Sequence, residues 1–484
     1  MEQIRKKRTI SLTEGPLLGK ILLFILPLMA SNLLQTLYNA ADMMVVSLSG
    51  EANAVGAIGF TGPFINMITN VFIGFSAGAT VVVARFLGAK DDEAVSNTVH
   101  TSIAMSLIFG VAGGIIGLIS AKPVLSLMGA EGSILELATT YTFIYFCGIP
   151  FISLTNYLIS ILRAKGDTKT PLIVLSLSGL LNVVLNLFFV LVCGLSVEGV
   201  ALATVIANAA SAVVLLILLM RDDGPCRFYL KRLRIEGSSF RSILHIGIPA
   251  GIQGALFSLS NMMIQSSNMT VNNWYGYDPN SYQPVMDGNA ATGNLEGFAY
   301  TATNAACQAA ITFTSQHMGA QKYERIKRVM LSCFAVTTII AVVFSGLIYL
   351  LRAPLLALYG VTGGAVGTPQ ALALETAELR MIWILLPYFL LALMEVAGGV
   401  VRGLGRSITS TVVSLIGSCL LRVVWLSTVF EWIFAKYDDP MLAQKTVYLS
   451  YPISWGLTAL IHLICVLVIL RSILKQRNQA RALT

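Results

Sequence analysis

The first apolar stretch of the chain carries polar side chains on one helical face. Four of them follow one another at steps of three, four and three residues, the spacing of neighbours on one side of an α-helix: Asn32, Gln35, Asn39 and Asp42. A carboxylate within a membrane span is costly and is a functional candidate by default. Asp42 is therefore predicted to take up and release a proton or a sodium ion. The alternative is a structural carboxylate that neighbouring amides satisfy.

Other residues of the first half could position or accompany this carboxylate. Pro27 lies earlier in the same stretch and removes a backbone hydrogen bond, which predicts a bend. Asn182 and Asn186 are one helical turn apart in another apolar stretch. Such amides either link helices or, together with Asn39, surround Asp42 as oxygen ligands for Na⁺ or as partners of a proton site. The sequence is compatible with either H⁺ or Na⁺ as the coupling ion.

The second half has its own charged residues within apolar stretches. Glu296 and Arg422 are predicted at similar depth, where they could form a neutral pair. Glu395 is about seven residues from Arg402, roughly 10 Å by helical rise, and has no evident cation at its depth. Glu395 is therefore the stronger candidate for a second titrating group.

Composition shows which elements hold these residues. The 484 residues are 56% hydrophobic and only 12% charged, and the mean hydropathy is +0.76. Charged residues make up about 25% of a soluble protein. The chain is therefore predicted to be an all-α polytopic membrane protein, with twelve spans near 17–47, 54–84, 94–119, 134–162, 169–192, 196–220, 243–271, 290–316, 328–351, 379–401, 407–435 and 447–470.

The basic residues indicate an orientation. Most of the 32 Lys and Arg fall at the two ends and in every second connection, so the positive-inside rule places both termini in the cytoplasm. The few basic residues on the opposite face include Arg380.

The sequence has no motif for a metal or a nucleotide cofactor. Seven cysteines form no C-x-x-C pair, and neither a phosphate-binding loop nor a zinc-binding H-E-x-x-H motif is present. We expect no cofactor, no metal and no nucleic-acid partner, and either an ion gradient or a partner subunit as the energy source.

The two halves of the sequence resemble each other. Leu87-Gly88-Ala89 recurs as Met318-Gly319-Ala320, and Arg163-Ala-Lys-Gly166 recurs as Arg402-Gly-Leu-Gly405, at nearly constant offset. Because each half has an even number of spans, the repeat is predicted to be parallel, about an axis along the membrane normal. The predicted organisation is a cytoplasmic segment, an N-lobe, a basic linker, a C-lobe and a cytoplasmic tail, at 1–16, 17–220, 221–242, 243–474 and 475–484.

These residues identify a resemblance to the MATE (multidrug and toxic compound extrusion) transporters, nearest the DinF-like prokaryotic branch. The matching segments occur in the family's order along nearly the whole chain: Leu26-Pro27, Tyr38-Asn-Ala-Ala-Asp42, Phe86-Leu-Gly88-Ala89, Arg163 to Pro171, and Arg402-Gly403-Leu404-Gly405. The resemblance implies two six-helix lobes that export organic, often cationic compounds in exchange for H⁺ or Na⁺. It also implies that Asp42 is the N-lobe coupling site, that Pro27 is the bend, and that the protein lies in a prokaryotic plasma membrane.

Two departures from the family pattern affect this expectation. The DinF-like branch usually has a second N-lobe aspartate where this chain has Asn186. Other branches have acids in the seventh and tenth spans, at positions that are Phe257 and Leu391 here. Glu296 and Glu395 could substitute for those acids, although no family motif assigns them that role.

The predicted function is a monomeric antiporter that works by alternating access, in the lipid bilayer and on small organic compounds. The predicted substrate cleft comprises polar residues of the first, fourth and seventh spans: Asn32, Gln35, Tyr38, Asn156, Gln253, Asn261 and Gln265. One alternative is a lipid-linked glycan flippase of related architecture, which would need several cationic side chains in its groove. The other is an intramembrane enzyme, which would need a metal-binding carboxylate pair or a His/Asp/Ser constellation.

Overall fold

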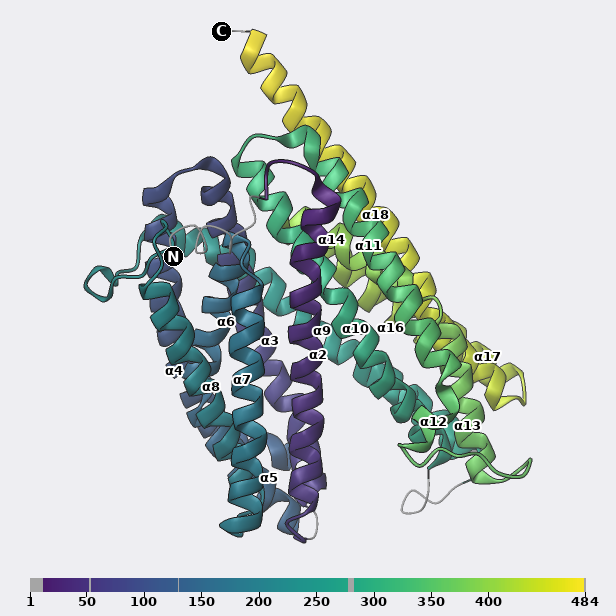
Figure 1. The fold of residues 1–484 in the computed structure, drawn as a ribbon. Coiled ribbons are helices and arrows are strands. Elements are labelled where there is room, and N and C mark those ends of the chain that lie inside the picture. Colours follow the sequence, from purple (N-terminus) through teal and green to yellow (C-terminus); the bar gives the residue numbers. More distant parts are fainter. Residues whose placement is uncertain (1–11, 52–53, 129, 277–282, 483–484) are drawn as a thin grey trace. The chain divides into compact units, whose positions relative to one another are not determined.

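The computed structural model describes residues 12–51, 54–128, 130–276 and 283–482, and over these residues the chain is helical, with no strand (Figure 1). The first half comprises α2 (Leu17–Ser47), α3 (Ala54–Ala89), α4 (Asp92–Leu127), α5 (Gly132–Cys147), α6 (Ile149–Lys165), α7 (Lys169–Leu187), the π-helical η1 (Phe188–Val192) and α8 (Val197–Met220). A short turn, η2 (Leu230–Arg232), lies in the basic linker.

The second half has more breaks. It comprises α9 (Gly237–Trp274), α10 (Pro284–Gly319), α11 (Tyr323–Leu350), α12 (Arg352–Ala357), α13 (Pro369–Arg380), η3 (Met381–Leu385), α14 (Tyr388–Gly403), α15 (Ser407–Ser414), η4 (Leu415–Leu420), α16 (Leu421–Trp425), η5 (Leu426–Phe430), α17 (Glu431–Lys436) and α18 (Pro440–Ala482).

Each of the twelve predicted spans corresponds to one helix or to one run of consecutive helices. Eight are long and apolar enough to cross a membrane as they stand. Two more are bent pairs, α5 with α6 at 50° and α13–η3 with α14 at 40°. The last two, α9 and α10, have 38 and 36 residues but carry more polar side chains. The prediction of an all-α polytopic membrane protein is confirmed.

The tenth span was predicted to start near residue 379, but its first helix starts at Pro369, so the prediction was wrong by about ten residues. α13 begins at Pro369, where the Thr368 hydroxyl accepts a hydrogen bond from the Ala371 backbone N–H at 3.3 Å. A threonine N-cap followed by proline is a strong start signal, but hydropathy does not register it. Arg380 consequently lies at the end of a twelve-residue helix and is 7% exposed, rather than lying in an outer connection.

The described chain forms two compact units that are discontinuous in sequence. The first contains residues up to Ala255 together with Thr312–Lys322 and Gly403–Ile408, and the second contains Leu256–Ile311, Tyr323–Arg402 and Thr409 onward. Within the first unit, α7 packs against both α2 and α8. Within the second, α18 packs against η3, η4, η5 and α16. The division into an N-lobe and a C-lobe at residue 220 stays a prediction.

The helices next to several candidate polar residues are irregular. The π-helical η1 begins two residues after Asn186, η3 begins directly after Arg380, and η4 and η5 flank the five-residue α16 that holds Arg422. A π-helical turn widens the backbone and is found disproportionately at functional sites.

The internal repeat is visible in the packing of the first compact unit. A methyl group added at Gly88 would lie 2.0 Å from the Gln316 carbonyl oxygen, and one added at Gly319 would lie 1.8 Å from the Arg85 carbonyl oxygen. Arg85 and Gln316 each precede the motif glycine of their own repeat by three residues. The glycine of each repeat therefore contacts the equivalent residue of the other repeat. The motif glycines therefore let the ends of α3 and α10 cross with their backbones in contact.

The residues after the two glycines adopt matching conformations. Lys90 and Gln321 both have positive φ, at 58° and 54°. The next backbone N–H donates across the helix end in both copies, from Asp91 to Phe86 at 3.1 Å and from Lys322 to His317 at 2.9 Å. The predicted parallel repeat is thus consistent with local geometry as well as with sequence.

We expect Gly319→Ala to lower the thermal stability of the protein strongly. The new methyl group would meet the backbone, which cannot move aside as a side chain can, and overpacking typically costs about 1–3 kcal/mol. Gly346→Ala in α11 is the matched control, because nothing lies within 4 Å of that site. Thermal unfolding in detergent measures both variants, and equal midpoints would contradict the proposed crossing.

Candidate functional site

The first compact unit brings Asp42 together with the predicted asparagines. The Asn186 side-chain nitrogen donates to the Asp42 carboxylate at 2.5 Å and to the Asn182 side-chain oxygen at 3.3 Å. Asn182 in turn donates to the Thr204 hydroxyl at 3.3 Å, and Thr204, which donates to the Val200 carbonyl oxygen at 3.0 Å, lies near Asp42. α2, α7 and α8 thus each supply part of one polar cluster, which we call the Asp42 cluster: Asp42, Asn182, Asn186 and Thr204.

Close packing of α2 on α7 positions the carboxylate. The Tyr38 hydroxyl donates to the Ser176 carbonyl oxygen at 3.1 Å. Gly179 leaves room for the Tyr38 ring, since a methyl group there would lie 1.8 Å from it. Asp42 follows Tyr38 by one helical turn, so its side chain reaches the next polar positions along α7.

The chemistry of the Asp42 cluster is that of an oxygen-lined anionic site. Asn186 is fully buried, and its side-chain oxygen has no hydrogen-bond partner. No lysine or arginine of the described residues pairs with Asp42. A carboxylate that accepts an amide N–H and lies near a hydroxyl and a further amide oxygen, without a described basic residue to neutralise it, suits an exchangeable cation or proton.

Two predictions about α2 have partial outcomes. The side chain of Asn39 lies outside the described residues, so its predicted part in the cluster stays a prediction. α2 continues through Pro27 as one unbroken helix (Figure 1), and the predicted bend at Pro27 also stays a prediction.

The predicted substrate-cleft residues are divided between the two units. Those of the first unit are Asn32, Gln35, Tyr38, Asn156 and Gln253, and those of the second are Asn261 and Gln265. Asn156 donates to the Ile152 carbonyl oxygen of its own helix at 3.0 Å, and Gln253 is buried. Gln35, Asn261 and Gln265 are exposed. Their role as a cleft stays a prediction.

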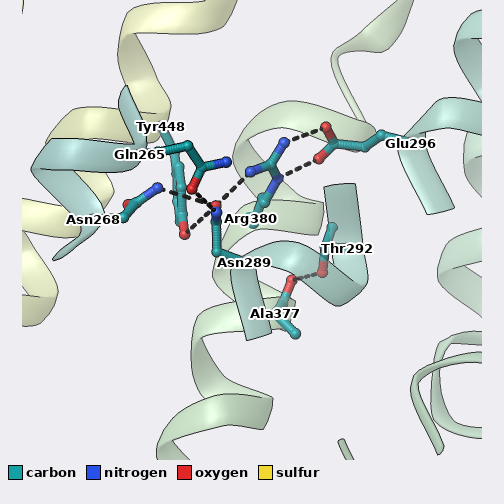
Figure 2. Close-up of polar contacts among 8 residues, drawn as sticks. All are labelled: Gln265, Asn268, Asn289, Thr292, Glu296, Ala377, Arg380 and Tyr448. Carbon is teal, nitrogen blue, oxygen red and sulfur yellow. Dashed lines mark hydrogen bonds and ion pairs between the residues drawn. The ribbon is translucent and has the colours of Figure 1, made fainter. Parts of the chain in front are cut away.

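In the second unit, Glu296 forms a buried ion pair with Arg380, so the predicted pairing of Glu296 with Arg422 was wrong. Arg380 approaches Glu296 with both sides of its fork, Nε to Oε1 at 2.8 Å and Nη2 to Oε2 at 2.7 Å (Figure 2). The side chains are 8% and 9% exposed. The reason is the extension of α13, which carries Arg380 to α10. A bidentate pair of this kind is a neutral unit that joins two helices.

An amide network that sequence reasoning missed extends from this ion pair. The Asn289 side-chain oxygen accepts hydrogen bonds from Arg380, from Asn268 at 3.1 Å and from the Tyr448 hydroxyl at 3.2 Å (Figure 2). Its nitrogen donates to Gln265 at 2.9 Å. Asn268 and Asn289 are fully buried, and their amides within long helices were the available signal.

Glu395 has a basic neighbour after all. Arg402 Nη2 lies 3.8 Å from Glu395 Oε2, and the Cys307 thiol lies 3.8 Å from the same oxygen. The interpretation of Glu395 as a carboxylate without a cation was therefore wrong. An arginine side chain is long enough to reach back along its own helix over the predicted axial separation.

Arg422 has no carboxylate partner among the described residues. Its Nε donates to the Ser454 hydroxyl at 2.9 Å. Its guanidinium carbon lies 4.2 Å from the centre of the Tyr451 ring and 5.7 Å from that of Trp455. We call Tyr451, Ser454 and Trp455 the α18 cage of Arg422.

These features define a polytopic helical membrane protein with polar groups held inside each unit, as expected of a protein that handles polar or charged solutes. The MatE family model matches residues 27–188 and 257–428. Since this is more than half of the chain, the protein belongs to the MATE family of multidrug efflux transporters. It is a membrane transporter and not an enzyme.

Two curated relatives are similar over different extents. The probable multidrug resistance protein YoeA of Bacillus subtilis is 25% identical over 449 residues, which cover 91% of each chain. The multidrug export protein MepA of Staphylococcus aureus is 27% identical over 255 residues, which cover 52% of this chain and 56% of that protein. Neither comparison supports a glycan flippase over an exporter.

Solved structures show the same fold. The outward-facing conformation of a multidrug resistance MATE family transporter has a TM-score of 0.84 at 21% identity, covering 97% of this chain and 99% of that chain. A MOP superfamily transporter from Pyrococcus furiosus has a TM-score of 0.83 at 21% identity, covering 96% and 99%. The predicted twelve-helix fold is thus confirmed.

Proposed function

We propose that this transporter is an antiporter that exports organic compounds, cationic or amphipathic, in exchange for H⁺ or Na⁺. The single observation that carries the proposal is the Asp42 cluster. It offers a carboxylate without a basic partner and a fully buried amide oxygen that has no hydrogen-bond donor. The names of the relatives, multidrug resistance and multidrug export proteins, support the substrate class.

The same cluster supplies a coupling mechanism. When the carboxylate of Asp42 binds an ion, its charge is neutralised, and both the hydrogen bond that it accepts from Asn186 and its interaction with the nearby Thr204 change. These partners belong to α7 and α8, so ion binding alters the contacts that hold α2 against them. Exchange of ion and compound requires only that each binds the inward-open and outward-open states with unequal affinity.

The proposal includes a cellular setting. The basic residues favour both termini in the cytoplasm. Membership of the MATE family, with bacterial relatives, supports a prokaryotic plasma membrane. The protein is proposed to work as a monomer, without a cofactor, because the coupling site is complete within the first compact unit.

The test is transport by purified protein in lipid vesicles, with ethidium as the organic cation. Vesicles receive an imposed H⁺ gradient, an imposed Na⁺ gradient at fixed pH, or neither. We expect at least about fivefold faster ethidium movement with one of the two gradients, the lower end of typical coupling. The gradient that drives transport identifies the coupling ion. Equal rates under all three conditions would overturn the antiport mechanism.

A further inference from the structure

Arg422 is a buried cation that differs from the other arginines inside the second unit. Arg380 has Glu296 as its partner and Arg402 has Glu395. Arg422 is 3% exposed, and within the described part of the chain no carboxylate pairs with it. Its Nη2 makes no hydrogen bond. Because a guanidinium stays ionised under all ordinary conditions, a positive charge is held here without a counterion.

The α18 cage orients this cation without neutralising it. The face of a guanidinium can rest on aromatic rings such as Tyr451 and Trp455 through cation–π attraction. That attraction uses the face of the group, whereas its N–H donors lie in its plane. Ser454 accepts a hydrogen bond from Nε only. The Nη2 donors remain available to an acceptor that the described residues do not supply.

The aromatic surroundings extend beyond the cage. The Trp455 ring packs edge-on against Tyr451, with centroids 5.4 Å apart, and against Tyr388 of α14, with centroids 5.6 Å apart. Cys419, a thiol three residues earlier on the same helix run, interacts electrostatically with Arg422. A planar cation with free donors, bordered by aromatic rings, is chemically matched to an aromatic compound that bears an acidic group.

The backbone around Arg422 is unusual in the same place. α16 is five residues long and is enclosed by η4 and η5, so the helix is π-helical on both sides of the arginine. Such segments are rare and occur often at functional sites.

We propose that Arg422 and the α18 cage form a binding site for the acidic group, a carboxylate or a phosphate, of aromatic compounds that this protein transports. The fork of the guanidinium matches the two oxygens of either group. The inference rests on the proposed export function. It extends the proposed substrate class to zwitterionic aromatic compounds.

The first test compares two dyes that differ only at an acidic group. Rhodamine B carries a free carboxylate, and its ethyl ester keeps the same cationic ring system. Gradient-driven export from vesicles is measured for the parent protein, Arg422→Gln and Arg422→Lys. Arg352→Gln is the control, since Arg352 pairs with Glu378 and both side chains are partly exposed.

We expect Arg422→Gln to slow export of rhodamine B by about tenfold relative to export of the ester, the loss typical of a removed charge-assisted hydrogen bond. Arg422→Lys keeps the charge, so its rate of rhodamine B export should lie between the rates of the parent protein and of Arg422→Gln. Arg352→Gln should leave the ratio of the dyes unchanged. An equal loss for both dyes, or no loss for either, would overturn the site.

A second measurement separates this inference from the export function. If the parent exports neither dye, the proposed function fails for this class, and thermal unfolding of the purified protein decides the site. Benzoate should raise the unfolding midpoint of the parent and of Arg422→Lys but not of Arg422→Gln, while neutral benzamide raises none of them. The same benzoate shift in the parent and in Arg422→Gln, or no shift in the parent, would contradict an anion site at Arg422.

Discussion

Asp42→Asn is expected to reduce gradient-driven efflux by about tenfold or more, within the range of typical coupling free energies. The replacement is nearly isosteric, and its amide oxygen can still accept the hydrogen bond that Asn186 donates to Asp42. The fold of the first compact unit should therefore persist. An amide cannot change its charge, however, so the imposed ion gradient no longer favours one state over the other.

The measurement is ethidium transport in vesicles under the gradient that drives the parent protein. Binding of ethidium to purified protein is measured in parallel, because a coupling residue should alter transport while binding changes by no more than about threefold. Asp92→Asn, an exposed residue in the first turn of α4, is the matched control. Gradient-driven efflux that survives Asp42→Asn would refute the role of the Asp42 cluster.

The Asp42 cluster could be predicted from sequence because it depends on helical periodicity. Asp42 lies on a polar face of α2, and Asn182 and Asn186 lie one turn apart on α7, so each set already pointed in one direction. The structure adds the packing of α2 on α7 that joins the two sets. Thr204 gave no signal, since a hydroxyl within an apolar helix can satisfy itself on its own backbone.

The ion pairs of the second unit could not be predicted in the same way. A pair such as Glu296 with Arg380 depends on where two helices start and on how far a side chain reaches. Neither quantity is contained in hydropathy. The sequence prediction puts Arg380 at the outer end of a span, because α13 is less apolar than its neighbours and hydropathy does not register its threonine and proline start signals. Once α13 is extended, Glu296 has a partner and Arg422 is left without one.

Arg380→Gln is expected to destabilise the protein by about 3–5 kcal/mol, the usual cost of removing one partner of a buried ion pair. The variant leaves the carboxylate of Glu296 buried without a counterion and removes one of the donors to Asn289 (Figure 2). The double variant Arg380→Gln with Glu296→Gln should recover much of this loss, because no uncompensated charge then remains.

Thermal unfolding in detergent measures the single and double variants against an exposed pair of the same unit. Arg352→Gln and Glu378→Gln break an ion pair whose side chains are 37% and 40% exposed, so the unfolding midpoint should hardly change. Arg422→Gln is an internal comparison, because it removes a buried charge that no carboxylate of the described residues pairs with. It should leave the midpoint unchanged or raise it. A similar fall in the unfolding midpoint for Arg422→Gln and Arg380→Gln would mean that burial of a guanidinium, rather than its pairing, determines stability. The distinction between Arg380 as a structural arginine and Arg422 as a ligand-binding arginine would then be refuted.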